Sequence, residues 1–398
     1  MKLTGPKFSN LNALLIIGCM ESIWAPMIPY IKQAFDLDEA QLGLMLLCTG
    51  IGSIAIIPFA GAICKHFGPK RLVYVFTVLI AIILSLISLN IHPYLTAFLL
   101  VLFGISLGII DVSANVNAIS LEKRFKQPLM SGFHGGYSVG TLIGAASMSF
   151  LLSINIHLII ATIFLVSLFG IYTLINCKQL LTKEELIDNE VESDKVKKSR
   201  FTNIPPLVFI VGILCFIMYT SEGAVMSWSS VYVNQDLGVD IRYSGYVYTA
   251  FAITMTCMRL FMGNTLVRKI GSKSIVVLGA TLVSIGFLLV GFIPQLFACI
   301  IGFALIGLGA ANIVPQLISF AGTIKGIPVP NTISLVNIIG YSGMLIGPSS
   351  IGFSAKNFGL STTFAIIGGI CCLVIIMGYN LPFASKSEQS NDKKNEEI

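Results

Sequence analysis

The sequence predicts an all-α membrane protein with twelve transmembrane helices in two pseudo-symmetric six-helix bundles. First, 55% of the 398 residues are hydrophobic and only 11% are charged, a composition typical of membrane proteins. Second, polar or Gly/Pro breaks divide the chain into apolar stretches that can each cross a bilayer, which takes about 20 residues. Third, the two halves of the chain repeat the same polar positions.

The apolar stretches number twelve, and each is predicted to form one transmembrane helix. The first follows Lys2 and Lys7, as a secretory signal would. Because Glu21 and Pro26 come next without a small-residue cleavage site, this helix is expected to stay in the mature chain. The predicted helices cover residues 9–32, 41–64, 72–89, 94–118, 129–152, 155–176, 205–232, 243–263, 274–292, 295–319, 331–354 and 361–382.

The positions of the positive charges predict that both termini are cytoplasmic, because Lys and Arg in short loops stay on that side. With this orientation, 21 of the 25 Lys and Arg residues are cytoplasmic; Lys32, Arg242 and Lys356 lie outside and Arg259 lies within a helix. The net charge of +6 is therefore a signal of topology. Nucleic acid is not expected as a partner, because no basic stripe is interleaved with exposed aromatic residues.

A change of composition divides the chain into domains. Between Lys178 and Arg200, acids and lysines replace the apolar pattern, which predicts a solvated linker. The nine cysteines lie in or beside apolar helices without a C-x-x-C pair and are predicted to be small core residues. We expect an N-terminal bundle over 1–177, a cytoplasmic linker over 178–204, a C-terminal bundle over 205–383 and a disordered cytoplasmic tail over 384–398.

The two bundles appear as an internal repeat in the sequence. Glu21 in the first helix matches Glu222 in the seventh at an offset of 201 residues, and Asp111 in the fourth matches Asn312 in the tenth at the same offset. The fifth and eleventh helices both carry Gly-Tyr-Ser and then Leu-Ile-Gly. Such repeats are typical of transporters whose substrate site lies between the halves near the bilayer midplane.

Glycines recur on one face of two helices. Gly136, Gly140 and Gly144 are four residues apart in the fifth helix, and Gly340 and Gly347 follow a similar spacing in the eleventh. Small residues let helix backbones approach closely. Both a sliding surface for rocking of the bundles and plain tight packing are consistent with this spacing.

Three acids lie well inside predicted helices: Glu21, Asp111 and Glu222. Each costs about 2.5–3.5 kcal/mol at a helix centre on insertion scales, so a functional role is the default hypothesis. Glu21 and Asp111 are predicted to carry protons, with His134 near enough to reach Asp111. The alternative for Asp111 is a structural anchor hydrogen-bonded to a nearby Asn. Glu222 is either a site residue or a relic of the repeat.

Uncharged hydrogen-bonding groups accompany these acids and suit a neutral polyol. Trp24 lies three residues after Glu21 on nearly the same helix face, where its indole would stack on a sugar ring; an interfacial aromatic belt is the alternative. Arg259 is predicted to be a snorkelling or gating residue. The predicted substrate-binding residues are Trp24, Asn115, Asn117, Glu222, Gln316 and Asn337.

The segment after the second helix reads Gly61-Ala62-Ile63-Cys64-Lys65-His66-Phe67-Gly68-Pro69-Lys70-Arg71. It resembles the marker Gly-x-x-x-Asp-Arg/Lys-x-Gly of the major facilitator superfamily, which has twelve helices in two bundles. The resemblance implies a gating role for the residues that match it here, which are Gly61, Gly68, Lys70 and Arg71. Lys65 stands in place of the family acid, which puts the usual charge latch of this loop in doubt.

Two further motifs resemble one branch of this superfamily. Asp111-Val112-Ser113-Ala114-Asn115 is similar to the Glu-x-x-Ala-Asn run of fucose permeases and their uncharacterised bacterial relatives. In those relatives a Phe-His-Gly segment opens the fifth helix, as Phe133-His134-Gly135 does here. The resemblance implies a bacterial inner-membrane protein with proton-linked acids on the first and fourth helices.

These features favour secondary active transport: proton-coupled uptake of a sugar or similar small polar solute by alternating access. A proton-driven exporter of drugs or siderophore-like metabolites is the alternative, since a fold alone does not fix function. A non-transporting receptor is disfavoured, because a scaffold has little reason to keep carboxyls at depth. No enzyme activity, cofactor, metal site or ATP-binding loop is predicted. The expected state is a monomer in the lipid bilayer, with a small-molecule substrate and protons as its partners.

Overall fold

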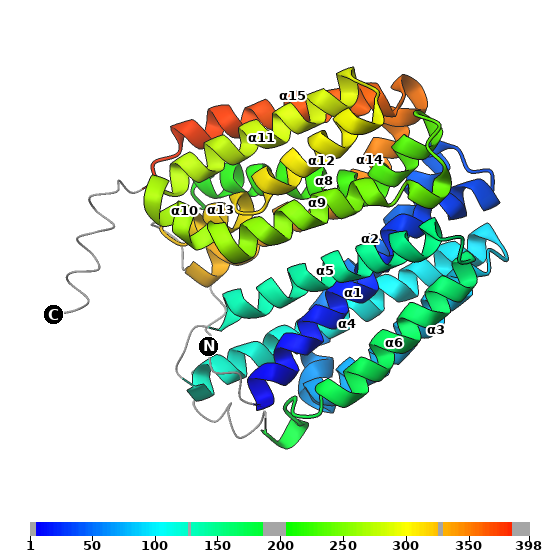
Figure 1. Cartoon of the computed structure of the whole chain (residues 1–398). Coiled ribbons are helices and arrows are strands. Elements are labelled where there is room, and N and C mark those ends of the chain that lie inside the picture. The colour runs from blue at the N-terminus through cyan, green and yellow to red at the C-terminus, as the bar shows by residue number, and fades with distance from the viewer. Residues whose placement is uncertain (1–4, 126–128, 186–203, 325–328, 384–398) are drawn as a thin grey trace.

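The computed structural model describes residues 5–125, 129–185, 204–324 and 329–383, and it is all-helical over these ranges apart from short turns (Figure 1). The all-α fold class is confirmed. Most of the predicted linker, residues 186–203, lies outside the described residues, and so does the predicted tail, residues 384–398.

The first six predicted helices are present, with bounds within a few residues of the prediction except where α4 runs seven residues further. Asp38 caps α2 reciprocally with Gln41: the Gln41 backbone N–H donates to the Asp38 carboxylate and the Asp38 backbone N–H donates to the Gln41 side chain. The helices are α1 (Gly5–Ala34), α2 (Glu39–Phe67), α3 (Pro69–Ser88), α4 (Pro93–Phe125), α5 (Met130–Ser153) and α6 (Leu158–Asn176).

The second six predicted helices are also present, but two of them are interrupted. The eighth crossing combines α9, the π-helical turn η2 and α10, and the tenth combines α12 and α13. The elements are α8 (Pro206–Gln235), η1 (Ile241–Tyr243), α9 (Tyr246–Cys257), η2 (Met258–Met262), α10 (Gly263–Ile270), α11 (Ser272–Phe292), α12 (Leu296–Ala310), α13 (Ile313–Ala321), α14 (Val329–Phe358) and α15 (Leu360–Asn380).

The described helices meet the requirements for crossing a membrane. Ten segments, including α12 with α13 as one, are long and apolar enough by length and composition. The two further crossings are the interrupted α9–η2–α10 segment and α14. Many of the membrane-crossing helices expose large apolar side chains, as lipid-facing helices do. Examples are Phe59 of α2, Ile160 of α6 and Ile376 of α15.

The glycine faces pack helices together within each half. A Cβ added to Gly140 of α5 would lie 1.9 Å from the carbonyl oxygen of Leu15 in α1. A Cβ added to Gly343 of α14 would lie 2.3 Å from the carbonyl oxygen of Phe216 in α8. Both partners belong to the same half as the glycine, so the structure favours the tight-packing interpretation over a sliding surface between halves.

The two halves lie side by side in Figure 1, with α1–α6 in one group and α8–α15 in the other. We call the end of the molecule that holds Lys70, Arg124 and Lys183 the basic end, and the end that holds Lys32 and Lys356 the opposite end. α1 begins at the basic end, where Gly5 lies against Gln179 of the segment after α6.

Candidate functional site

Glu21 is held by a tyrosine at the middle of the first half. The hydroxyl of Tyr137 in α5 donates a hydrogen bond of 2.5 Å to Oε2 of Glu21 in α1. Gly140 and Gly144 make this contact possible, because they let α5 lie directly against α1. This hydrogen bond fixes the orientation of the Glu21 carboxyl.

Asp111 faces the space between the halves. Its carboxylate accepts a 3.1 Å hydrogen bond from the amide of Asn115, one turn further along α4, and its side chain is exposed. The charge of Asp111 acts on Glu21 within the first half and on Tyr341 of α14 in the second half. Asp111 is therefore in electrostatic reach of both halves.

Glu222 and Arg259 form a charged pair within the second half. Nη2 of Arg259 lies 3.9 Å from Oε1 of Glu222, at the limit of an ion pair. Arg259 also reaches into the first half, where Nη1 donates a 3.2 Å hydrogen bond to Oγ of Ser138 in α5. Beside it, the hydroxyl of Thr256 donates to the carbonyl oxygen of Ser138 at 2.9 Å. Arg259 thus joins the two halves next to the acids.

The tenth crossing breaks where Arg259 contacts it. α12 ends at Ala310 and α13 begins at Ile313, and Nε of Arg259 donates a 3.1 Å hydrogen bond to the freed carbonyl oxygen of Ala311. The amide nitrogen of Asn312 is buried and has no hydrogen-bond partner within the described ranges. Interrupted helices with free backbone groups mark binding sites in secondary transporters.

Aromatic rings complete the site. Tyr219 of α8 and Tyr341 of α14 stack with ring centroids 4.8 Å apart at 27°, and Tyr341 remains 47% exposed. Tyr248 of α9 is buried within electrostatic reach of both Glu21 and Glu222. The site therefore combines acids with an exposed aromatic face and several hydroxyls.

At the opposite end, ionic and polar contacts join the two halves. The ammonium of Lys32 in α1 is only 5% exposed and donates to Glu39 of the same half at 3.0 Å and to Gln235 of the other half at 2.6 Å. Lys356 of α14 pairs with Asp38 at 2.9 Å, also across the halves. These residues close this end of the molecule.

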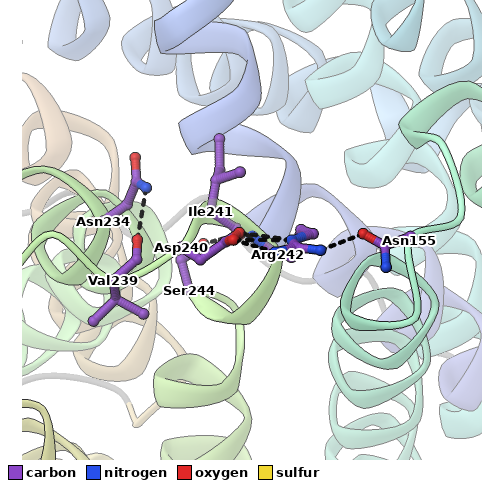
Figure 2. Close-up of polar contacts among 7 residues, drawn as sticks. All are labelled: Asn155, Asn234, Val239, Asp240, Ile241, Arg242 and Ser244. Atoms are coloured by element: carbon purple, nitrogen blue, oxygen red, sulfur yellow. Dashed lines mark hydrogen bonds and ion pairs between the residues drawn. The ribbon is translucent and has the colours of Figure 1, made fainter.

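A third contact at this end involves Arg242, as Figure 2 shows. Its guanidinium pairs with Asp240 beside it and donates to the side chain of Asn155, which follows α5 in the first half. The Arg242 side chain and then its backbone N–H hold the pKa of Asp240 at about 2. Asp240 therefore stays ionised throughout the physiological pH range, and protons do not operate this contact.

Contacts between the halves extend less far toward the basic end along α2 and α14. A Cβ added to Gly352 would lie 2.4 Å from the carbonyl oxygen of Glu39, and Gly43 and Gly50 also lie against α14. Taken with the exposure of Asp111, this places the opposite end in the closed state and leaves the site more open toward the basic end.

The family model described as Major Facilitator Superfamily matches residues 11–323 and 211–398. The chain belongs to this superfamily. An uncharacterised MFS-type transporter of Yersinia pestis is 35% identical over 356 residues, which are 89% of this chain and 90% of that protein. The family consists of transporters, so this chain is a multi-pass membrane transporter.

Solved structures share the superfamily fold with this transporter. The nucleoside transporter NupG superposes with a TM-score of 0.73 at 13% identity, over 94% of this chain and 98% of that one. A D-xylose–proton symporter superposes with a TM-score of 0.70 at 14% identity, over 96% and 97%. At these identities the likeness shows the fold alone.

The superfamily marker loop of this transporter lies at the basic end, away from the acids. Gly68 has a φ of +80°, and a Cβ there would lie 2.6 Å from the backbone nitrogen of Lys183, so glycine is required. Gly61 faces open space. Lys70 and Arg71 line a cavity beside the 182–184 segment. The gating role expected for this loop stays a prediction.

Two predicted site residues of this transporter are buried in the protein core. Trp24 is only 4% exposed and packs in the core, so little of its ring is available for stacking in this state. Asn117 is fully buried: its amide donates to Asn10 at 2.9 Å and accepts from the backbone of Leu181 at 3.0 Å, which ties α4 and α1 to the segment after α6.

The binding roles predicted for Gln316 and Asn337 and the proton-coupling role of His134 stay predictions. Gln316 and Asn337 are half-buried on α13 and α14, and no side-chain hydrogen bond is found for either within the described ranges. The charged neighbour that acts on His134 is Arg259, not Asp111. In the described part of the chain, His, Cys, Asp and Glu do not gather in groups of three or more suited to a metal ion.

Sequence reasoning missed Tyr137, Tyr219, Tyr248 and Tyr341 as site residues. For Tyr137 and Tyr341 a signal existed, because both are the central residue of the Gly-Tyr-Ser repeat. Tyr219 and Tyr248 carry no comparable pattern. Their place follows only from how the helices pack against each other.

Proposed function

We propose that this transporter takes up a sugar or similar small polar solute together with protons, by alternating access. The observation that carries the proposal is the arrangement of Glu21 and Asp111. These two acids lie on α1 and α4 within electrostatic reach of each other, and the charge of Asp111 also reaches Tyr341 across the halves. A proton bound there changes the forces within one half and between the two halves.

The proton acts through like-charge repulsion. Two carboxylates at this depth repel each other, and binding one proton to the pair removes that repulsion. Tyr137 and Asn115 each donate a hydrogen bond to one of the two carboxylates, so protonation also weakens or redirects those bonds. The site therefore favours one arrangement when a proton is bound to Glu21 or Asp111 and another when both carboxylates are free of protons.

Substrate enters the same equilibrium by binding one state of the site better than the other. The amide of Asn115 and the hydroxyls of Tyr137 and Tyr341 can exchange hydrogen bonds with a hydroxylated solute. The exposed ring of Tyr341 offers a flat surface to a sugar ring. The resemblance of the 111–115 motif to fucose permeases supports the same class, and the D-xylose–proton symporter shares the fold.

Arg259 is the proposed link between the site and the halves. Its three contacts, to Glu222, Ser138 and Ala311, join α8, α5 and the break in the tenth crossing. A substrate that draws Arg259 away from Ser138 releases a bond between the halves. On the proposed orientation, the basic end is cytoplasmic and the present state is open inward.

The test is to measure proton movement in vesicles containing the purified protein. A panel of sugars, polyols, nucleosides, amino acids and lipophilic cations is added outside with no imposed gradient, and internal pH is followed with a trapped dye. The proposal expects a sugar or polyol to acidify the interior, with transport independent of sodium. Alkalinisation by a lipophilic cation would instead indicate exchange, and a response that requires sodium would rule out proton coupling.

A further inference from the structure

A cavity of about 500 Å³ lies at the basic end, distant from the acids of the proposed transport site. Its walls come from the marker loop between α2 and α3 and from the segment that follows α6. Four of the side chains that line it are basic: His66, Lys70, Arg71 and Lys183. Glu184 is the acid of the lining, so positive groups outnumber negative ones.

The fold builds this cavity rather than leaving it to mobile side chains. The backbone N–H of Lys70 donates a 3.2 Å hydrogen bond to the carbonyl oxygen of Leu181, which fastens the two walls together. Gly68 lets the segment around Lys183 approach the loop backbone. α3 begins at Pro69 directly after this loop, so the positive end of its helix dipole lies at the cavity.

An apolar stripe runs along α3 from the cavity. Starting at Arg71, exposed residues follow at intervals of four, three and four positions: Val75 is 52% exposed, Val78 is 48% exposed and Ile82 is 51% exposed. This spacing keeps them on one face of the helix. In a membrane transporter such an exposed apolar face lies against lipid chains. The basic cavity thus sits where a lipid-facing surface ends.

We propose that this cavity and stripe form a binding site for one anionic phospholipid. Lys70, Arg71 and Lys183 receive the phosphate, Tyr74 and Phe67 in the lining contact the glycerol region, and the acyl chains lie along the α3 stripe. Basic pockets beside transmembrane helices recognise acidic headgroups in this way. A free phosphate compound would use the charges but not the stripe, so the combination selects a lipid.

The bound lipid would also cross-link two parts of the first half. Arg71 belongs to α3, whereas Lys183 belongs to the segment beyond α6. A phosphate shared between them holds this segment against the marker loop. The proposal does not depend on the transport substrate or on proton coupling.

Lipid titration of the purified full-length protein, followed by native mass spectrometry, tests the proposal. Phosphatidylglycerol is compared with zwitterionic phosphatidylcholine, and glycerol 3-phosphate is added as a soluble competitor. The wild type should bind one phosphatidylglycerol in preference. The double variant Lys70→Gln with Arg71→Gln should weaken that binding on the order of 30-fold at low ionic strength, because it removes two charges near the phosphate.

The matched control removes two charges from the equivalent loop of the second half. Lys269→Gln with Lys273→Gln should leave phosphatidylglycerol binding within about threefold of the wild type. The ammonium of Lys273 lies over the ring of Tyr379, 4.4 Å from the ring centroid. The control therefore removes two positive charges, one of which already contacts another part of the protein.

A further variant, Lys183→Gln, guards against misfolding of the double variant, because it lies outside the transmembrane helices. It should weaken phosphatidylglycerol binding several-fold. Equal losses in control and test variants, or unchanged binding in Lys183→Gln and the double variant, would overturn the proposal. Displacement of the lipid by glycerol 3-phosphate at similar concentrations would also overturn it, since the ligand would then be a soluble phosphate compound.

Discussion

Replacing Gln235 by alanine should open the opposite end of the molecule more often. Lys32 donates to Gln235 across the halves but to Glu39 within its own half. The variant therefore removes a bond that exists only in the closed state, while the buried ammonium keeps Glu39 as its partner. This choice avoids leaving an unpaired buried charge, which would destabilise both states.

The size of the effect follows from the type of bond. Hydrogen bonds to charged groups contribute about 1.5–3 kcal/mol, and Gln235 is exposed, so water recovers part of this. A net loss of about 1 kcal/mol shifts the equilibrium between closed and open states about fivefold. The exposed pair of Lys356 and Asp38 should contribute less, since surface ion pairs are worth about 0–1 kcal/mol.

The assay is the rate at which a membrane-impermeant thiol reagent modifies Ser149→Cys. Ser149 is fully buried between the halves, where its hydroxyl lies 3.4 Å from that of Thr249, so reaction requires opening. Mass spectrometry of the peptide containing residue 149 keeps the nine native cysteines out of the measurement. Gln235→Ala should raise the rate about fivefold.

The matched control is Asn357→Ala at the same end. The amide of Asn357 donates to the carbonyl oxygen of Phe353 in its own helix, so its loss leaves the contact between halves intact. Its rate at position 149 should stay within about twofold of the parent. A rate for Gln235→Ala that matches this control would refute the assignment of Lys32 and Gln235 as a closing contact.

Further variants at Gly140, Asn117 and Tyr341 test the packing and the site. Gly140→Ala should lower stability by about 1–3 kcal/mol, because the new methyl group meets the carbonyl oxygen of Leu15, whereas Gly61→Ala should be neutral; thermal unfolding in detergent measures both. Asn117→Ala should cost about 1–3 kcal/mol of stability through its two lost buried bonds and leave substrate affinity unchanged; a loss of affinity alone would restore its predicted binding role. Tyr341→Ala should weaken substrate binding more than Tyr341→Phe, which keeps the stack on Tyr219; equal affinities in counterflow would remove this ring from the site.

The helices and their bounds were predictable because the bilayer imposes one length scale on every crossing. The hydrophobic pattern therefore placed α5 at 129–152, within one residue of its observed start at Met130 and end at Ser153. It did not reveal the break after Ala310 or the π-helical turn at Met258. A signal for the break existed in the sequence, because Asn312 lies at it and Pro315 has no N–H to donate to the carbonyl oxygen of Ala311. The contacts of Arg259 accompany both interruptions.

The acids of the site were predictable from their cost in a membrane, but their partners were not. Glu21 and Tyr137 are 116 residues apart, and only the close packing of α1 and α5 brings them together. Trp24 and Asn117 show the converse. Their side chains suggested contacts with a substrate. Packing buries the Trp24 ring, however, and hydrogen bonds within the protein engage the Asn117 amide.

The central claim is that Glu21 and Asp111 carry the protons that drive uptake, and amide variants in vesicles test it most directly. Glu21→Gln keeps an acceptor for the Tyr137 hydroxyl, and Asp111→Asn keeps one for Asn115, so the site should stay assembled. We predict that each variant loses accumulation driven by a pH gradient while it retains counterflow of the same solute. Normal accumulation by both variants under a pH gradient would contradict the claim and make these carboxyls structural.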